Sequence, residues 1–236
     1  MLSEAQRAAF ENDGFVVLKG VFSQTEVQMW REECARLQAH TPVSEASDRV
    51  QWRDHRNGKP VADRFDPVID ISPPFETLAH DERIVSAVKS ALGEPVQLFK
   101  DKLITKRPGT DGYGLHQDYP YWTCAGLPPE ALLSVQVSID PADAANGALE
   151  VFPGRHHREL EGPPNEPRDV DPSAVDPDRG QVIEAQAGDL LLFHSLVPHR
   201  SSANTSERNR RTLYLTYAQT EDASIYDQYY ESRPEY

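Results

Sequence analysis

The motif His-Gln-Asp at residues 116–118 combines two side chains that can bind a metal ion. It lies in the stretch GYGLHQDYPYW, and His116 and Asp118 are two positions apart. On a β-strand this spacing directs both side chains to the same face. One imidazole nitrogen and one carboxylate oxygen suit a divalent first-row metal ion. Alone, however, a His-x-Asp pair is more typical of a turn or of a hydrogen-bonded pair than of a metal site.

A second histidine from elsewhere in the chain would complete a facial triad. His194 and His199 are the candidates, and we expect both to lie on a pair of neighbouring strands late in the chain. Two histidines and one carboxylate leave open coordination positions, an arrangement that is diagnostic of non-haem Fe(II) oxygenases. His194 has a simpler interpretation, as a packed or hydrogen-bonded histidine of the preceding strand.

The position of Arg210 favours His199 as the second histidine. Arg210 follows His199 by eleven positions and begins the last alternating segment, RRTLYLTYAQ. A hairpin through residues 201–209 would place the two side chains on adjacent strands. An inward guanidinium can bind a carboxylate through two hydrogen bonds, which a dicarboxylate cosubstrate needs and a metal alone does not. Arg208 and Arg211 lie beside it, and charge patterning alone favours a surface cation.

The composition of the chain excludes several classes of protein. No apolar run among the 236 residues approaches the ~20 that a membrane span needs, and the N-terminus lacks the features of a secretory signal. Two cysteines without a C-x-x-C motif exclude a thiolate-rich zinc site and argue against a disulfide framework. We therefore expect a cytoplasmic protein that does not bind membranes.

The net charge of −14 limits the kinds of molecule that we expect the protein to bind. It argues against a nucleic-acid partner, which needs a basic face. It also argues weakly against a highly anionic substrate, although a local basic pocket can override the net charge. We expect a small-molecule substrate and no obligatory protein partner.

Up to about residue 95 the pattern predicts helices around a short strand, GFVVLKGVF. Ser3 with Gln6 and Ser23 with Glu26 both match the capping box that begins a helix. After the second box, apolar residues recur at a spacing of three and four, which predicts one buried helix face. These residues are Val27, Trp30, Cys34 and Leu37. A third helix is predicted over about 81–92, where Gly93 follows as the C-terminal cap.

From about residue 96 to 220, short alternating runs are separated by Gly, Pro and Asp, a pattern typical of an all-β sandwich or barrel. We therefore expect a mainly β protein in which helices flank a double-stranded β-helix, the jelly-roll core of cupin type, in a single domain over residues 1–236. Residues 40–76 and 161–180 fit no element. Long loops often act as lids, and either segment could cover the mouth of the barrel.

Four blocks, in order, resemble the phytanoyl-CoA dioxygenase family of Fe(II)/2-oxoglutarate-dependent oxygenases, and the resemblance covers nearly the whole chain. FENDGFVVLKGVFSQTEV, from residue 10, resembles the N-terminal strand and helix of the family. HQD resembles its proximal metal motif, and NGALEVFPGRHH, residues 146–157, its Asn-Gly and Pro-Gly-x-His hairpin. GDLLLFHSLVPHRSSANTSERNRR, residues 188–211, resembles its distal block.

The resemblance implies that His116, Asp118 and His199 bind iron and that 2-oxoglutarate and O2 occupy the open positions. The family decarboxylates 2-oxoglutarate to succinate and CO2 while it oxidises a C–H bond of the substrate. Halogenases of this superfamily carry Gly or Ala where this chain has Asp118. The carboxylate therefore favours oxygenation or oxidative ring closure over halogenation.

The resemblance also implies residues that bind the cosubstrate. Arg210 and Ser201 would hold the distal carboxylate of 2-oxoglutarate. Gln136, ten residues before the Asn-Gly turn, and Lys102, on the strand before HQD, fall where the family often places cosubstrate-facing side chains. SVQVSI fits either face of a strand, so a solvent-facing Gln136 is an equal alternative.

Three aromatic residues follow the proximal motif directly, namely Tyr119, Tyr121 and Trp122. They could form a substrate-binding wall of amphipathic rings, suited to stacking on a sugar or polyketide. Core packing accounts equally well for one or two of them. We expect Tyr119 or Trp122 to line the pocket.

The predicted function is an Fe(II)- and 2-oxoglutarate-dependent oxygenase of a small secondary metabolite, with hydroxylation or oxidative ring closure as the outcome. In size the chain resembles bacterial enzymes of antibiotic biosynthesis, including those that act on sugar-containing natural products, and no basic patch suits coenzyme A. One alternative is a non-catalytic cupin-like metal-binding protein or sensor, which has no need of Arg210. Another is a carbohydrate-binding module, which needs no triad.

Overall fold

The structure is a computed structural model that describes residues 1–39, 49–54 and 60–233. Its strands form a seven-stranded and a four-stranded antiparallel sheet that face each other. The larger sheet has the order β1 (Phe15–Leu18), β9 (Leu190–His194), β6 (Leu132–Ser138), β11 (Arg210–Gln219), β4 (Val96–Lys106), β3 (Pro60–Phe65) and β2 (Val50–Asp54). The smaller has the order β5 (Tyr113–His116), β10 (His199–Ser201), β7 (Leu149–Val151) and β8 (Gln181–Val182). The predicted mainly β, jelly-roll fold is confirmed.

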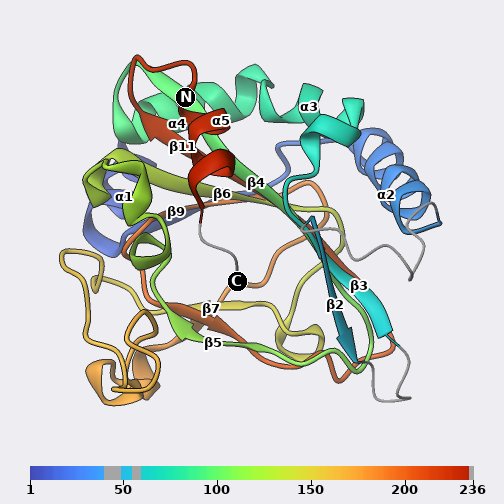
Figure 1. Ribbon diagram of the computed structural model, residues 1–236. Helices are drawn as coiled ribbons and strands as arrows, with labels where there is room; N and C mark the ends of the chain where they lie inside the picture. The colour runs from blue at the N-terminus through green and yellow to red at the C-terminus, as the bar shows by residue number, and fades with distance from the viewer. Residues whose placement is uncertain (40–48, 55–59, 234–236) are drawn as a thin grey trace.

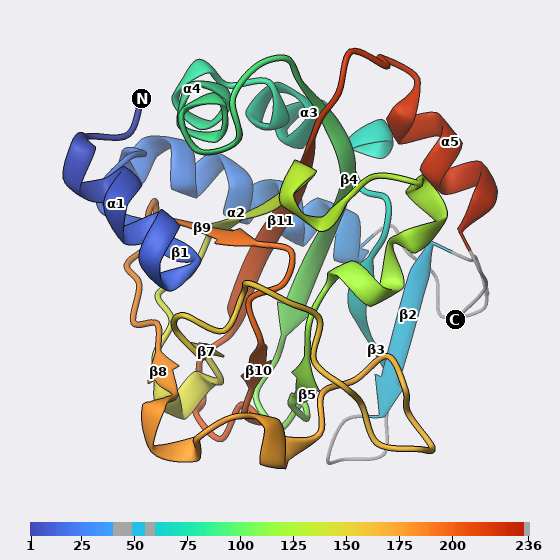
Figure 2. The same ribbon diagram turned by 90° about the vertical axis from the view of Figure 1, so that its left-hand side faces the viewer.

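The helices are α1 (Glu4–Asp13), α2 (Gln24–Ala39), α3 (Pro73–Ala79), α4 (Glu82–Leu92) and α5 (Ile225–Ser232). Short 3-10 turns are η1 (Ile69–Ile71), η2 (Tyr119–Tyr121), η3 (Thr123–Ala125), η4 (Pro129–Ala131), η5 (Ala144–Asn146), η6 (Pro172–Ala174) and η7 (Pro177–Arg179). Figure 1 shows α2, α3 and α4 on the outer side of the larger sheet, and Figure 2 shows the smaller sheet on its other side. The larger sheet is therefore the middle layer of the molecule.

The helix boundaries follow from local capping. The Ser3 side chain accepts a hydrogen bond from Gln6 N at 3.2 Å, and Ser3 N donates to Gln6 Oε1 at 2.9 Å. Ser23 and Glu26 make the same reciprocal pair at 3.3 and 2.8 Å. Because these bonds satisfy backbone donors that the first turn leaves free, they fix where α1 and α2 begin. Both predicted capping boxes are confirmed.

Alternate residues of β11 pack into two different apolar clusters. Leu213, Leu215 and Tyr217 face the helices and join the main core, which includes the predicted apolar face of α2. Tyr214 faces the other way, into the space between the sheets, and packs with residues such as Phe193. Successive strand residues point to opposite faces, so one strand lines both the core and the interior of the jelly roll.

The N-terminal region contributes strands as well as helices. β1 pairs with β9, and β3 pairs with β4, so both join the larger sheet. The hairpin of β2 and β3 lies within the segment 40–76 that matched no element in the sequence, and α3 begins near the end of that segment. Residues 40–48 and 55–59 of that segment lie outside the described residues, so its role as a cover for the barrel stays a prediction. Single-domain organisation likewise stays a prediction.

Across the described ranges, no helix combines the length and the apolar character needed to cross a lipid bilayer.

Candidate active site

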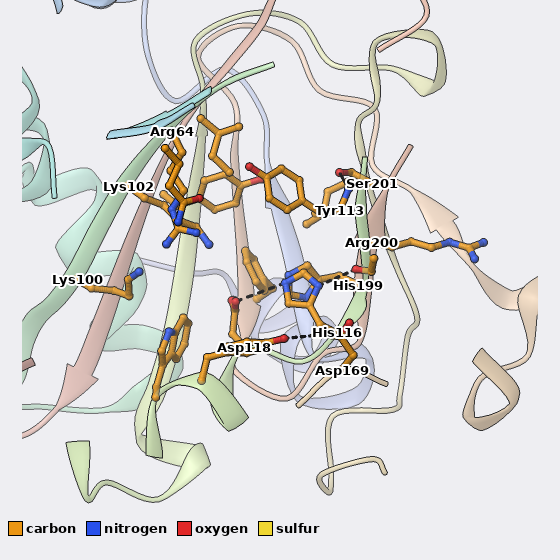
Figure 3. Close-up of a pocket in the computed structure, with 18 of the residues that line it drawn as sticks. Arg64, Lys100, Lys102, Tyr113, His116, Asp118, Asp169, His199, Arg200 and Ser201 are labelled. Carbon is orange, nitrogen blue, oxygen red and sulfur yellow. Dashed lines mark hydrogen bonds and ion pairs between the residues drawn. The ribbon is translucent and has the colours of Figure 1, made fainter. Parts of the chain in front are cut away.

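His116, Asp118 and His199 meet in the space between the sheets (Figure 3). Each offers one ligand atom, and these atoms all lie within 4.8 Å of one another. The imidazole centroids are 4.2 Å apart, and His116 Nε2 is 3.8 Å from Asp118 Oδ1. Asp118 and His199 are buried, while His116 is half-buried. In the part of the chain that the structure describes, this is the one group of three such donors close enough to hold a metal ion.

Strand pairing brings the two histidines together. His116 ends β5, His199 begins β10, and the two residues are directly opposite in the antiparallel register. A hydrogen bond joins the Nδ1 of each ring to the backbone carbonyl two residues earlier, Gly114 O at 2.8 Å and Val197 O at 2.9 Å. Because a carbonyl can only accept, each Nδ1 carries the proton, which leaves the Nε2 lone pair free for a metal.

Asp118 reaches the site from a turn, and the prediction that it shares a strand with His116 is wrong. β5 ends at His116, and Asp118 has the helical backbone angles φ −73° and ψ −37° at the start of η2. Its backbone N–H donates to Ser195 O at 3.0 Å. The carboxylate therefore joins the triad because the chain turns, not because of strand alternation.

Gln117, between the two ligands, holds that turn in place, a role the sequence did not reveal. Its side chain is fully buried, and its Nε2 donates to Leu196 O at 2.6 Å and to Arg158 O at 3.0 Å. Its Oε1 accepts from Leu160 N at 2.7 Å. The amide thus links the metal motif to two other segments through hydrogen bonds to their backbone. A displacement of Gln117 would break a buried hydrogen bond.

The charge state of the group is suited to a metal cation. Burial and the nearby His116 lower the pKa of His199 to about 4, so its imidazole is neutral at pH 7. Burial alone would raise the pKa of Asp118, but Lys102 and the two imidazoles hold it below its ordinary value. Two imidazoles and one carboxylate are the donor set of a facial triad for Fe(II).

Arg210 lies across the cavity from the triad, on the other sheet. It begins β11, whose partner residue there is Lys106 of β4, whereas His199 is on β10 of the smaller sheet. The predicted hairpin between His199 and Arg210 is therefore wrong. Residues 202–209 cross from one sheet to the other, and because the sheets face each other both side chains still line one cavity of about 250 Å³.

His194 is not part of the triad. It lies on β9, opposite Leu133 of β6, so the expectation that its strand pairs with that of His199 is also wrong. Its Nδ1 accepts a hydrogen bond from Leu196 N at 3.0 Å, and its ring lies 5.4 Å from that of His156. These contacts are those of a packed, hydrogen-bonded histidine.

The guanidinium of Arg210 is buried with unused donors. Among the described residues, its Nε and Nη1 have no hydrogen-bond partner, and neither has the buried Nε2 of Gln136. The Tyr214 hydroxyl lies between these two residues, since it donates to Gln136 Oε1 at 3.1 Å and also contacts Arg210. A buried unpaired donor is costly, and most of all a charged one. This end of the cavity therefore fits a carboxylate.

Of the other predicted cosubstrate residues, Ser201 and Lys102 line the cavity and Gln136 does not. Ser201 lines the cavity, and its Oγ accepts from Lys106 Nζ at 2.8 Å. Lys102 lines it as well, with its Nζ 5.1 Å from the centroid of the Tyr214 ring. Gln136 is buried rather than solvent-facing, but it is not among the residues that line the cavity and reaches it through Tyr214.

The aromatic residues divide between the cavity and the core. Tyr121 and Trp122 line the cavity. Of the two residues of which we expected one to line the pocket, Trp122 does so and Tyr119 does not. The Tyr119 hydroxyl donates to Leu127 O at 3.1 Å, and its ring packs in the cluster around Phe99.

The sequence missed several residues of the cavity, including Arg64, Lys100, Tyr113 and Asp169. Asp169 comes from the segment 161–180, forms a β-bridge with His116 and accepts a hydrogen bond from the Tyr121 hydroxyl. That segment therefore reaches the cavity. Arg64 comes from β3 and points into the cavity with Lys100 and Lys102 (Figure 3). Despite the net charge of −14, the cavity has a locally basic wall.

A jelly roll that places two histidines and a carboxylate opposite a buried arginine defines the class of iron- and 2-oxoglutarate-dependent oxygenases. The chain belongs to the phytanoyl-CoA dioxygenase (PhyH) family, whose model matches residues 10–212. It is a 2-oxoglutarate-dependent non-haem iron dioxygenase, with Fe(II), 2-oxoglutarate and O2 as the reactants of that class.

Relatives in the family have diverse names. The chain is 28% identical over 234 residues to the 2-aminoethylphosphonate dioxygenase of uncultured bacterium HF130_AEPn_1, covering 99% of this chain and 88% of that one. It is 27% identical to the methylphosphonate hydroxylase of Gimesia maris, covering 98% and 86%. The solved structure of EctD from S. alaskensis with 2-oxoglutarate and 5-hydroxyectoine has a TM-score of 0.76 at 24% identity, covering 92% and 76%. The last likeness shows the fold.

Proposed function

We propose that the protein oxidises a C–H bond of a small metabolite and releases succinate and CO2. In this proposal His116, Asp118 and His199 bind Fe(II), and Arg210 with Ser201 binds the distal carboxylate of 2-oxoglutarate. The observation that carries it is the buried guanidinium of Arg210, whose Nε and Nη1 lack partners among the described residues, in the same cavity as the triad.

The chain's own groups would each have a defined task. Bound iron supplies the redox chemistry with O2. The Nδ1 hydrogen bonds of both histidines keep their Nε2 atoms directed at the metal, and Asp118 remains ionised beside them. Tyr121 and Trp122 form an aromatic wall that excludes water from the reacting C–H bond and holds it in position.

Different observations support the roles of individual residues and the choice of substrate. Lys102 and Gln136 remain further candidates for cosubstrate binding, Lys102 in the cavity wall and Gln136 behind Tyr214. A secondary metabolite of antibiotic biosynthesis, modified by hydroxylation or ring closure, is one candidate substrate, supported by the resemblance in size and motifs. A small phosphonate is the other, supported by the names of two relatives that match nearly the whole chain and by the basic cavity wall.

A non-catalytic metal-binding protein or sensor is the alternative. It gives no reason for a buried arginine with unused donors opposite the triad, so the cavity favours the enzyme. We also propose a cytoplasmic location without an obligatory protein partner. Both cysteines are free, Cys34 buried and Cys124 exposed, as a reducing compartment would allow.

The proposal predicts a weak visible charge-transfer band when Fe(II) and 2-oxoglutarate are added to the protein without oxygen. His199→Ala should abolish the band, because one of three ligands is lost. His194→Ala is the matched control, a buried histidine outside the triad, and should keep it. A wild-type protein that shows no band and forms no succinate with any substrate tested would refute the enzymatic function.

A further inference from the structure

Three cationic side chains line one wall of the cavity. Arg64 comes from β3, and Lys100 and Lys102 come from β4. Figure 3 shows them on the side of the cavity away from Ser201. Arg200 also borders the cavity, but it points away and its Nε donates to Glu150 Oε2 at 2.6 Å. Arg64, Lys100 and Lys102 therefore make up this cationic wall, and Arg210 presents a further buried charge to the same cavity.

Among the described residues, one carboxylate contacts two members of this wall. The buried carboxylate of Asp66 contacts Lys100 Nζ at 3.2 Å and Arg64 Nε at 3.0 Å. It also receives a hydrogen bond from Arg233 Nη1 at 2.9 Å, so three cations share one carboxylate. In a buried site this excess of positive charge is screened much less than at the surface.

Lys102 is the member of this wall without a partner. Its Nζ makes no hydrogen bond or ion pair with any residue in the described part of the chain, and it lies beside Lys100 and Arg64. Burial lowers the pKa of Lys102 to about 8; the Asp118 carboxylate opposes this shift, whereas Lys100 and Arg64 add to it. The protein alone thus leaves an ammonium unpaired next to its binding cavity.

Arg64 is held with one face toward the cavity. Its Nε and Nη2 both contact Asp66, and its Nη1 has no hydrogen-bond partner among the described residues. Asp66 is itself fixed by the Tyr230 hydroxyl of α5 at 3.0 Å and by Arg233. Because Asp66 fixes the guanidinium on the side away from the cavity, the guanidinium is preorganised to bind an anion on the cavity side.

We propose that the substrate carries an anionic phosphonate group that binds between Lys102 and Arg64 while the remainder of the molecule extends toward the iron site. This inference rests on the proposed function. Arg210 lies opposite Lys106, four residues beyond Lys102 on β4. At about 3.3 Å per residue the backbones at these two positions are ~13 Å apart along the strand, so we assign the anionic group of the substrate and the distal carboxylate of 2-oxoglutarate to different parts of the cavity.

The test is a binding measurement on the protein loaded with Fe(II) and 2-oxoglutarate without oxygen. Methylphosphonate and 2-aminoethylphosphonate are the anionic probes, and dimethyl methylphosphonate is the uncharged analogue of the first. Calorimetry should show that methylphosphonate binds at least roughly tenfold more tightly than the diester, because only the anion makes charge-assisted hydrogen bonds. Failure of both phosphonates to bind, or equal binding of the diester, would overturn the proposal.

Lys102→Met removes the charge and keeps most of the length of the side chain. It should weaken methylphosphonate binding about tenfold or more and leave binding of the diester unaffected. Lys102→Arg should restore most of the affinity. Arg200→Met is the matched control, a cation at the same cavity that already pairs with Glu150, and should bind the probe like the wild type.

Three outcomes separate this inference from the function on which it rests. If the band forms but Lys102→Met weakens binding of 2-oxoglutarate instead of methylphosphonate, Lys102 belongs to the cosubstrate site, and only the subsite is refuted. If the wild type forms neither the band nor succinate, the proposed function fails whatever the anion does. Displacement of 2-oxoglutarate by methylphosphonate would show that the anion binds at Arg210, which also refutes the subsite.

Discussion

At the scale of single residues, Gln117 shows how a metal site depends on a side chain that does not bind the metal. Its amide makes three hydrogen bonds to backbone and places Asp118 beside two histidines. We expect Gln117→Leu to lower the free energy of unfolding by about 2–4 kcal/mol, since buried backbone groups lose their partners. It should also weaken Fe(II) binding.

Urea unfolding and anaerobic metal titration measure these two effects. Gln181→Leu, at an exposed glutamine of β8, is the control and should change neither. If Gln117→Leu is destabilised but binds Fe(II) as the wild type does, the turn does not need the amide to position Asp118.

Arg210→Ala tests the cosubstrate site. Loss of the guanidinium should raise the concentration of 2-oxoglutarate needed for half-saturation at least roughly tenfold, because a bidentate charged contact is lost. Fe(II) binding should stay nearly unchanged, since Arg210 is on the opposite sheet from both histidines. Arg208→Ala, at an exposed arginine paired with Asp143, is the control. Parallel loss of metal binding would assign Arg210 a structural role.

The sequence predicted those residues whose chemistry is linked by spacing or by a motif. His116, Asp118, His199 and Arg210 belong to motifs that resemble a family, and the structure brings them to one cavity. Arg64 and Asp169 could not be found in this way, because they lie in segments without periodicity and reach the cavity only through the fold. Their contribution depends on long-range pairing, which composition and spacing do not encode.

At the scale of elements, β5 and β10 must lie at close distance for the two histidines to meet. A Cβ on Gly112 would lie 2.0 Å from Ser201 O, a backbone atom of β10. We therefore expect Gly112→Ala to push the strands apart, to cost about 1–3 kcal/mol of stability and to weaken Fe(II) binding.

Gly114→Ala, two residues further on and within β5, is the matched control. There the nearest atom to the new Cβ would be Asp169 Oδ2 at 3.8 Å, an ordinary contact. Thermal unfolding measures the stability of both variants, and metal titration measures their Fe(II) binding. Equal behaviour of the two would show that the close approach at Gly112 is not needed to position the ligands.

Asp66 joins β4 through Lys100, β3 through Arg64 and the C-terminal cap of α5 through Arg233. Because the substitution removes the carboxylate charge that these three cations share, Asp66→Asn should lower the free energy of unfolding by about 3–5 kcal/mol at pH 7. Asp70→Asn, at a half-exposed pair with Arg49, is the control and should cost under about 1 kcal/mol.

The pH dependence of this effect has a defined sign. Burial opposes ionisation of Asp66, but Lys100, Arg64 and Arg233 hold its pKa below the ordinary value of 3.8. Its stabilisation is therefore complete above the unfolded pKa and is lost as the pH falls below it. Urea unfolding should show the gap between wild type and Asp66→Asn shrinking in acid. A gap that widens below that pH would contradict the ion-pair explanation.

At the element scale, the pairing of strands could not be predicted from the sequence, whereas some helices could. Helices α1, α2 and α4 were predicted, since capping boxes and apolar periodicity are local signals, whereas α3 and α5 were not. The partner of a strand is not local: residues 202–209 have a length typical of a hairpin, yet they link β10 and β11 in different sheets. The hairpin of β2 and β3 was missed because its charged residues obscure the alternation.

At the scale of the whole molecule, the two cysteines report on global unfolding. Cys124 is exposed, whereas Cys34 is buried in the main core, where burial raises its pKa to about 12. A thiol reagent at pH 7 to 8 should label one cysteine quickly in the native protein and the second only after unfolding. Mass spectrometry during urea titration checks this. Rapid labelling of Cys34 in the native state would mean that α2 detaches locally.

The division of the site between the two sheets links the lifetime of the protein to its ligands. In the proposed complex, iron is held mainly by the smaller sheet and the far end of 2-oxoglutarate by the larger, so the ligand joins the layers. By mass action, ligand at one hundred times its Kd adds about 2.7 kcal/mol to the free energy of unfolding. Since proteases degrade the unfolded fraction, the amount of enzyme in a cell would rise and fall with the supply of 2-oxoglutarate, even without a change in gene expression.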